Sequence, residues 1–268
     1  MARLQIPQNL NIDTVLEFPD ASEPLVVDAS GVRFVEPTGL VQLSLLLQHI
    51  ASRSTDVQFV APNDQAVGVY LARMDFYNDV PPSIGLVNAI NPRSIGRQAL
   101  NDVLIPLRRF QTSREAEELS EDLRQFIRGQ DLPAPLHSVI WDIAAELCDN
   151  AASHGWSPHG GFLAAQRYGS DNRQIAVADL GVGIRKHLAR NPLYASVTSD
   201  VAAIEKAIKP GVTGTNERRG WGLNEVQEQA GRVHRATLII RSGDGVARVA
   251  IAGPRRTRSF STTTVVGL

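Results

Sequence analysis

The sequence predicts an α/β protein made of two parts, each with its own strands and helices. Between residues 24 and 76, short apolar runs alternate with stretches of helical periodicity, which is the order of a βα layer. From about residue 102 on, two consecutive helices precede strands that pair as a hairpin, which favours a mixed sheet with helices on one face. A segment rich in proline separates the two patterns. We therefore predict domains over residues 1–98 and 99–268.

The composition is that of an ordinary globular protein. Of the 268 residues, 43% are hydrophobic and 21% are charged, and the formal net charge of -1 argues against a protein that coats nucleic acid. No apolar run approaches the roughly 18 to 20 residues that a membrane span needs, and no signal-peptide segment is seen. The single cysteine, Cys148, excludes an intramolecular disulfide and fits a reducing compartment. We expect a cytoplasmic protein without a membrane partner.

The first part should form two strand–helix pairs. "LVVDAS" is a short apolar run that suits a buried strand, and "DVQFVAP" is a second strand closed by a proline. "PTGLVQLSLLLQHIASRS" has leucines at helical spacing from Leu40 to Leu47, and "DQAVGVYLARMDF" should be a second helix. Residues 77–98, with Pro81, Pro82 and further turn-forming residues, are predicted to be a linker. The alternative is a long surface loop within one domain.

The second part should open with the strand "DVLIPLRRF", followed by the helices "SREAEELSEDLRQFIRG" and "PLHSVIWDIAAELCDNAASHG". The second helix has the apolar stripe of a core-facing helix, formed by Ile140, Ile143, Leu147 and Ala151. Next come a strand and glycine-rich turn, "RQIAVADLGVGI", and a polar stretch of helix and loop to residue 219. The helix "GLNEVQEQAGR" and the hairpin "ATLIIRSGDGVARVAI", with "SGDG" as its turn, complete the pattern.

Two polar features of this part could carry chemistry. Residues four apart lie one above another on a helix, so Asp142, Glu146, Asn150 and His154 should form a polar column opposite the apolar stripe. "DLGVGI" places Asp179 at the end of a strand, where glycines let the backbone approach a ligand and a carboxylate could accept a hydrogen bond from an exocyclic amine. Taken alone, the column could be a solvated helix face and the glycines a tight turn.

A third feature, "GVTGTNERRGWGLNEV", places four glycines ahead of a helix. The backbone N–H groups and the positive dipole end of a helix N-terminus suit phosphate, although a surface loop would read the same way. Neither a P-loop nor the glycine fingerprint of dinucleotide-binding folds is present.

In their order and spacing, the E-x-x-x-N helix, D-x-G-x-G-I and the helix that starts with G-x-G-L resemble the ATP-binding domain of the GHKL superfamily. This domain is shared by DNA gyrase, a class of heat-shock chaperones, histidine kinases, MutL proteins and bacterial anti-sigma-factor kinases. The resemblance covers roughly residues 99 to 252 and implies a Bergerat-type α/β sandwich that binds ATP and Mg²⁺, with a lid over residues 185–219. Relatives finish with a Gly-Thr turn and a last strand. Here the sequence stops at "STTTVVGL", so either the domain is truncated or its last strand is missing.

The resemblance assigns roles to individual residues. Glu146 matches the carboxylate that activates water or a hydroxyl, and Asn150 matches the asparagine that coordinates Mg²⁺. His154 falls where many relatives have a basic or polar residue near phosphate, and Asp179 matches the aspartate that receives the adenine amino group. The other ATP-binding residues implied are Gly181, Gly183, Ile184, Thr213, Arg218, Gly220, Trp221, Gly222 and Leu223.

The stretch "LVVDASGVRFVEPTGLVQLSLLL" resembles the STAS domain of anti-sigma-factor antagonists, over roughly residues 10 to 75. In those antagonists a strand leads to an Asp-Ser-Ser-Gly turn and a leucine-rich helix. Here the turn is Glu36, Pro37, Thr38 and Gly39, so Thr38 falls where the antagonists carry their phosphorylated serine. The change of Asp-Ser to Glu-Pro leaves two alternatives open, a phosphoacceptor or a merely structural helix start.

Together the resemblances imply an ATP-binding regulatory protein in which a STAS-like domain is fused to a histidine-kinase-like ATPase domain. It would phosphorylate a Ser or Thr of a protein partner, such as a STAS-like or sigma-factor-type regulator, or hydrolyse ATP to drive lid closure. The alternative is a nucleotide-sensing module that never turns ATP over. Histidine autokinase activity is less favoured, because no separate helical hairpin presents a phosphoacceptor histidine. Nucleic acid is not expected as a partner, and a homodimer is left open.

Overall fold

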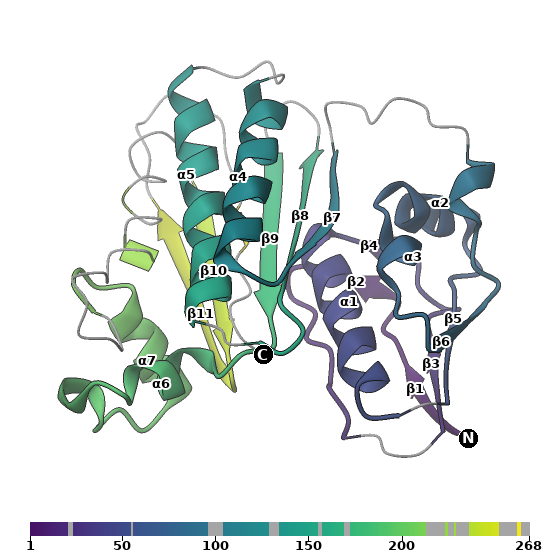
Figure 1. The fold of residues 1–268 in the computed structure, drawn as a ribbon, viewed down its shortest axis with the longest axis horizontal. Helices are drawn as coiled ribbons and strands as arrows, with labels where there is room; N and C mark the ends of the chain where they lie inside the picture. Colours follow the sequence, from purple (N-terminus) through teal and green to yellow (C-terminus); the bar gives the residue numbers. More distant parts are fainter. Residues whose placement is uncertain are drawn as a thin grey trace. The chain divides into compact units, whose positions relative to one another are not determined.

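The computed structural model describes residues 1–20, 24–54, 56–95, 104–128, 134–154, 157–168, 172–212, 223–224, 228, 236–251 and 262–263. Strands and helices follow one another along the whole chain, and both parallel and antiparallel strand pairs occur, so the fold is mixed α/β (Figure 1). The chain divides into two compact units, residues 1–107 with 164–166, and residues 108–163 with 167–268. The predicted boundary near residue 98 lies outside the described residues. None of the described helices is long and apolar enough to cross a membrane.

The first unit contains a four-stranded sheet in which every neighbouring pair runs parallel. In spatial order its strands are β1 (Ala2–Gln5), β3 (Leu25–Asp28), β5 (Val57–Val60) and β6 (Ile84–Val87). All four residues of β3 are buried, as expected for an inner strand of a parallel sheet. The short strands β2 (Asn9–Leu10) and β4 (Phe34–Val35) form a separate parallel pair. The strands predicted from "LVVDAS" and "DVQFVAP" are confirmed.

The helices of this unit are α1 (Pro37–Ala51), α2 (Gln65–Arg73) and the short α3 (Phe76–Asp79). Pro37 starts α1, at a position where a helix N–H has no intrahelical partner. The leucines of α1 are buried, and so is Gln42, whose amide donates to the Thr14 carbonyl (3.1 Å) and accepts from the Leu16 N–H (3.2 Å). Asp64 caps α2 by accepting from two backbone N–H groups. Both predicted helices are confirmed.

The predicted linker over residues 77–98 is wrong for its described part, which ends at residue 95. Tyr77 is buried in α3, and Ile84 begins β6, the outermost strand of the parallel sheet. Pro81 and Pro82 precede this strand, so their lack of a backbone N–H removes no hydrogen bond from the sheet. The prolines therefore mark the approach to an edge strand, and a 3₁₀ turn, η1 (Pro92–Ser94), follows it.

The rest of the chain contributes two three-stranded sheets. In spatial order, the first sheet consists of β7 (Leu104–Phe110), β8 (Gly161–Tyr168) and β9 (Asn172–Asp179). The second consists of β11 (Gly245–Ile251), β10 (Ala236–Ser242) and β12 (Thr262–Thr263). β10 and β11 form the predicted antiparallel hairpin, and Gly243 at its turn has a φ of 56°. β8 was not predicted. β12 pairs parallel with β10 and lies beside β9.

Two long helices, α4 (Ser113–Arg128) and α5 (Ala134–Asp149), pack side by side on one face of these strands (Figure 1). Both were predicted. The indole N–H of Trp141 donates to the Ser120 carbonyl (2.7 Å), which joins the two helices. In the apolar stripe of α5, Ile143 and Leu147 are buried, and the side chain of Ile140 lies outside the described residues.

Shorter helices follow β9. They are α6 (Gly183–Leu188), the 3₁₀ turn η3 (Pro192–Tyr194) and α7 (Asp200–Ala207). α7 packs on the β10–β11 hairpin and on α6. The predicted mixture of helix and loop is confirmed as far as residue 212. Of the helix predicted from "GLNEVQEQAGR", residues 223, 224 and 228 are described, and all three are helical.

Candidate functional site

The predicted polar column continues beyond α5 only in part. The regular helix ends at Asp149 and is followed by a π-helical segment, η2 (Asn150–His154). A π-helix joins residue i to residue i+5, so residues four apart no longer stack on one another. Glu146 therefore lies one α-helical turn before Asn150. The side chain of His154 is outside the described residues.

Asn150 is half-buried, and its amide nitrogen is buried without a hydrogen-bond partner within the described part of the chain. Leaving a buried polar group unsatisfied costs about 1–3 kcal/mol, so such a group in a native protein calls for an explanation. π-helical turns occur frequently at functional sites. The segment is fixed by Ser153, whose hydroxyl donates to the Asp149 carboxylate (2.7 Å) and meets the Ser113 hydroxyl (3.2 Å). Asn150 therefore carries an unsatisfied amide nitrogen in a π-helical turn that the hydrogen bonds of Ser153 hold in place.

The neighbours of Asn150 on α5 differ in what chemistry they can do. Glu146 is half-buried, which leaves part of its side chain accessible. Cys148 is fully buried, and that burial, together with the charge of Asp149, raises the pKa of its thiol well above the usual range. A buried thiol that stays protonated is a poor nucleophile. Glu146 is therefore the reactive candidate on this stretch.

Asp179 ends β9 and is only 1% exposed. One of its carboxylate oxygens accepts a hydrogen bond from the Gly181 N–H (2.7 Å), so the side chain shapes the turn that follows it. Gly183 has a φ of 74°, a conformation that other residues adopt only with strain. Ile184, the next residue, is buried near the start of α6. The predicted residues of "DLGVGI" therefore form one compact turn around a buried carboxylate.

A serine that the sequence analysis missed joins these two regions. Ser157 lies just beyond η2, and its hydroxyl accepts from the Leu180 N–H (3.3 Å), in the turn after Asp179. η2 also packs against β9. The end of α5, with Asn150, and the end of β9, with Asp179, are thus brought together from separate parts of the sequence. No local pattern around Ser157 signals this contact.

The third predicted motif is described only at its end. Leu223 is buried, and the amide of its neighbour Asn224 donates to the Ile208 carbonyl (3.4 Å), close to the end of α7. The predicted residues that lie outside the described part of the chain are Thr213, Arg218, Gly220, Trp221 and Gly222. Of the lid predicted over residues 185–219, the described portion forms most of α6, all of η3 and α7, and residues to 212.

The donor groups limit the kind of metal ion that the site could hold. Among the described residues, no group of three or more His, Cys, Asp or Glu side chains comes together as a metal cage. An ion near Asn150 would take one amide oxygen from that residue and most ligands from phosphate and water. Mg²⁺ binds in this way, so the residues present fit it.

Thr38, the predicted phosphoacceptor, lies in the first turn of α1 and is fully buried. Its hydroxyl has no hydrogen-bond partner in the part of the chain that the structure describes. A strand-forming segment covers it: the Glu36 N–H donates to the Leu10 carbonyl (2.7 Å), and the Ile12 N–H donates to the Glu36 carboxylate (2.9 Å). A kinase could reach the fully buried Thr38 only after the structure around it opened.

Comparisons of the chain with protein-family models, with curated proteins and with solved structures give no match. A functional conclusion therefore depends on the residues of the site and on their chemistry.

Proposed function

We propose that the second unit binds Mg–ATP where the end of α5 meets the end of β9. In this proposal the protein is a regulator in which a STAS-like unit is fused to a Bergerat-type ATP-binding domain of the GHKL superfamily. The observation that supports the proposal is the hydrogen bond from the Leu180 N–H to Ser157, together with the packing of η2, the segment of Asn150, against β9. The segments that carry these two motifs, η2 and β9, pack against each other, as a shared nucleotide site would require.

Asp179 would recognise the adenine base. One of its oxygens orients the Gly181 N–H, and a carboxylate has about four lone-pair sites, so it can also accept from the exocyclic amine of adenine. Its burial strengthens such a hydrogen bond, because the surroundings compete less than water does. The glycine turn lets the backbone come close to the flat face of the base.

Asn150 and Glu146 would act at the phosphate end. Asn150 would supply one oxygen ligand to Mg²⁺, and the bound ion would neutralise phosphate charge. Glu146, one turn earlier on the same helix face, would orient a water or a hydroxyl and accept its proton. Residues of the third motif, from Gly220 to Leu223, would complete the phosphate site with backbone N–H groups.

Two activities remain open within this proposal. The protein would transfer the γ-phosphoryl group to a Ser or Thr of a protein partner, or it would hydrolyse ATP to switch the conformation of a lid. Because α6 and α7 pack on each other and on the β10–β11 hairpin, we expect these two helices to keep their positions when ATP binds. A chain that binds ATP and never turns it over would be the sensing module considered above.

A Glu146→Gln variant tests the catalytic role. With Mg²⁺ and γ-labelled ATP, we expect binding to match that of the wild type, while phosphate release or partner labelling falls by about 100-fold or more. Glu117→Gln, the same substitution at an exposed position of α4, is the matched control and should leave turnover unchanged. Label on a partner identifies a kinase, and label in free phosphate an ATPase. Bound ATP without turnover in the wild type identifies a sensor, and absence of ATP binding overturns the proposal.

A further inference from the structure

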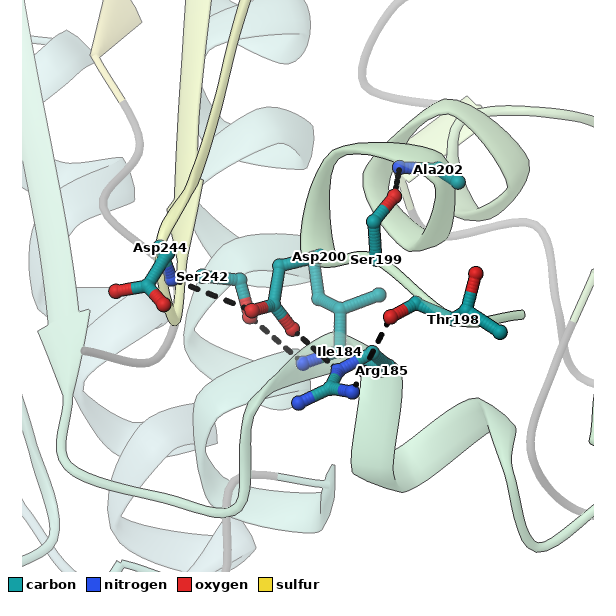
Figure 2. Close-up of polar contacts among 8 residues, drawn as sticks. All are labelled: Ile184, Arg185, Thr198, Ser199, Asp200, Ala202, Ser242 and Asp244. Atoms are coloured by element: carbon teal, nitrogen blue, oxygen red, sulfur yellow. Dashed lines mark hydrogen bonds and ion pairs between the residues drawn. The ribbon is translucent and has the colours of Figure 1, made fainter.

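The helices that follow the Asp179 turn are fastened to the tip of the β10–β11 hairpin (Figure 2). Arg185 of α6 donates from Nε to the Asp200 carboxylate of α7 (2.8 Å) and from a terminal nitrogen to the Thr198 carbonyl (3.4 Å). The other oxygen of Asp200 accepts from the Asp244 N–H at the hairpin turn (3.3 Å). Asp200 therefore joins both helices to the hairpin.

Three glycines allow this close approach. A Cβ on Gly243, which has a φ of 56°, would lie 2.7 Å from the Asp200 carboxylate, and one on Gly245 would lie 2.7 Å from the Asp200 carbonyl carbon. A Cβ on Gly183 would lie 3.0 Å from the hydroxyl of Ser242. The absence of a side chain therefore lets Gly243 and Gly245 approach Asp200 of α7, and lets Gly183 of α6 approach the hydroxyl of Ser242.

Ser242 makes the contact closest to the proposed site. Its hydroxyl is buried at the end of β10 and accepts from the Ile184 N–H at 2.8 Å (Figure 2). The first N–H groups of a helix have no intrahelical partner and need one from elsewhere. Val182, which precedes α6, has no side-chain acceptor to offer. A residue from a distant strand therefore fixes where α6 begins, and with it the far end of the turn that starts at Asp179.

We infer that Ser242 is a positioning residue for adenine, an inference that rests on the proposed function. Its hydroxyl anchors Ile184, which holds the Asp179–Gly183 turn in the shape that presents the carboxylate to the base. Glu146 lies on α5 and Asn150 on η2, so the phosphate end of the site does not depend on this anchor. Loss of the hydroxyl should therefore affect discrimination between bases more than it affects phosphate binding.

The test compares ATP and GTP binding to the full chain in Mg²⁺. In Ser242→Ala the buried Ile184 N–H loses its acceptor, and we expect ATP affinity to fall about tenfold and the preference for ATP over GTP to fall with it. Ser242→Thr keeps a hydroxyl and should restore the preference. Ser199→Ala is the matched control, because the Ser199 hydroxyl caps α7 by accepting from the Ala202 N–H (3.2 Å) and does not contact the turn.

Hydrogen exchange at Ile184 gives a second readout that needs no nucleotide. Its amide should exchange faster in Ser242→Ala than in the wild type or in Ser199→Ala. If the wild type prefers ATP and Ser242→Ala keeps that preference, the inference is wrong while the proposed function stands. If the wild type binds neither nucleotide, the proposed function is wrong, and the positioning role falls with it.

Discussion

The start of α1, with Thr38, and the segment that follows α5, with Asn150, each carry a buried polar atom without a hydrogen-bond partner in the described residues. Thr38 is fully buried under the segment that contains Leu10, whereas Asn150 is half-buried in a π-helical turn. An unsatisfied polar atom therefore occurs both in a fully buried residue, Thr38, and in a half-buried one, Asn150. We expect a ligand to approach Asn150 more readily than Thr38, because part of the Asn150 side chain is exposed.

The largest effect should come from Asn150→Ala. In Mg²⁺ we expect its affinity for ATP to fall at least about tenfold, because a ligand of the ion is lost. Without nucleotide, its free energy of unfolding should be equal to or above that of the wild type, because the substitution removes an unsatisfied buried nitrogen. Calorimetric titration and urea denaturation measure the two quantities. Asn191→Ala, which removes the cap of η3, is the control and should leave ATP affinity unchanged.

The stability of the first unit should be sensitive to any increase in side-chain volume at the buried start of α1. A Cβ on Gly39 would overlap the backbone carbonyl of Leu10, so Gly39→Ala should destabilise the first unit by about 1–3 kcal/mol. Gly85→Ala is the control, since the nearest atoms to its added Cβ lie at 3.7 Å, an ordinary contact. Urea denaturation compares the two variants. Equal free energies of unfolding for Gly39→Ala and Gly85→Ala would show that Leu10 does not pack closely against the start of α1.

A third buried polar group, Asp28, is fully partnered, and its contribution should depend on pH. Hydrogen bonds from Ser30, with help from the Arg3 guanidinium (2.8 Å), hold the pKa of Asp28 below its ordinary value. A lowered pKa in the folded state gives stability that is present at neutral pH and is lost as the pH falls through that lowered pKa. Asp28→Asn should cost about 1 kcal/mol at neutral pH. The difference from the wild type should shrink below about pH 3.9, and a constant difference would contradict this account.

The smallest effect should come from Thr38→Val, which replaces an unpartnered hydroxyl with a methyl group of similar shape. We expect the first unit to gain up to about 1 kcal/mol of stability, with ATP binding by the second unit unchanged. Denaturation and titration of the same preparation measure both. A loss of stability would show that the hydroxyl is satisfied, and labelling of wild-type Thr38 by γ-labelled ATP would show that the covering segment opens.

Most of the fold could be predicted from sequence patterns because its elements have clear periodicity. The leucines of α1, the acidic first turn of α4 and the "SGDG" turn each identify their element locally. β6 was mistaken for linker because only Ile84 of that strand is buried, which leaves little alternation to detect. β8 was missed because its alanine-containing sequence, "GFLAAQRY", has weak strand propensity and gains its burial from neighbouring strands.

The candidate site was predictable in its residue types and less so in its geometry. The identities of Glu146, Asn150 and Asp179 followed from motif order. The π-helical turn after Asp149 and the contacts of Ser157 and Ser242 did not, because each depends on a partner far away in the sequence. The burial of Thr38 was likewise not predicted, because no pattern within α1 indicates that the segment of Leu10 bonds to the adjacent Glu36.

Equilibrium binding of ATP to the full chain, with and without Mg²⁺, tests the central claim most directly. We predict that ATP binds saturably, that Mg²⁺ strengthens this binding and that ADP competes with it. Asp179→Asn should abolish ATP binding while the variant stays folded. Absence of saturable binding at millimolar ATP, or binding that Asp179→Asn leaves unchanged, would contradict the claim that the junction of α5 and β9 is a nucleotide site.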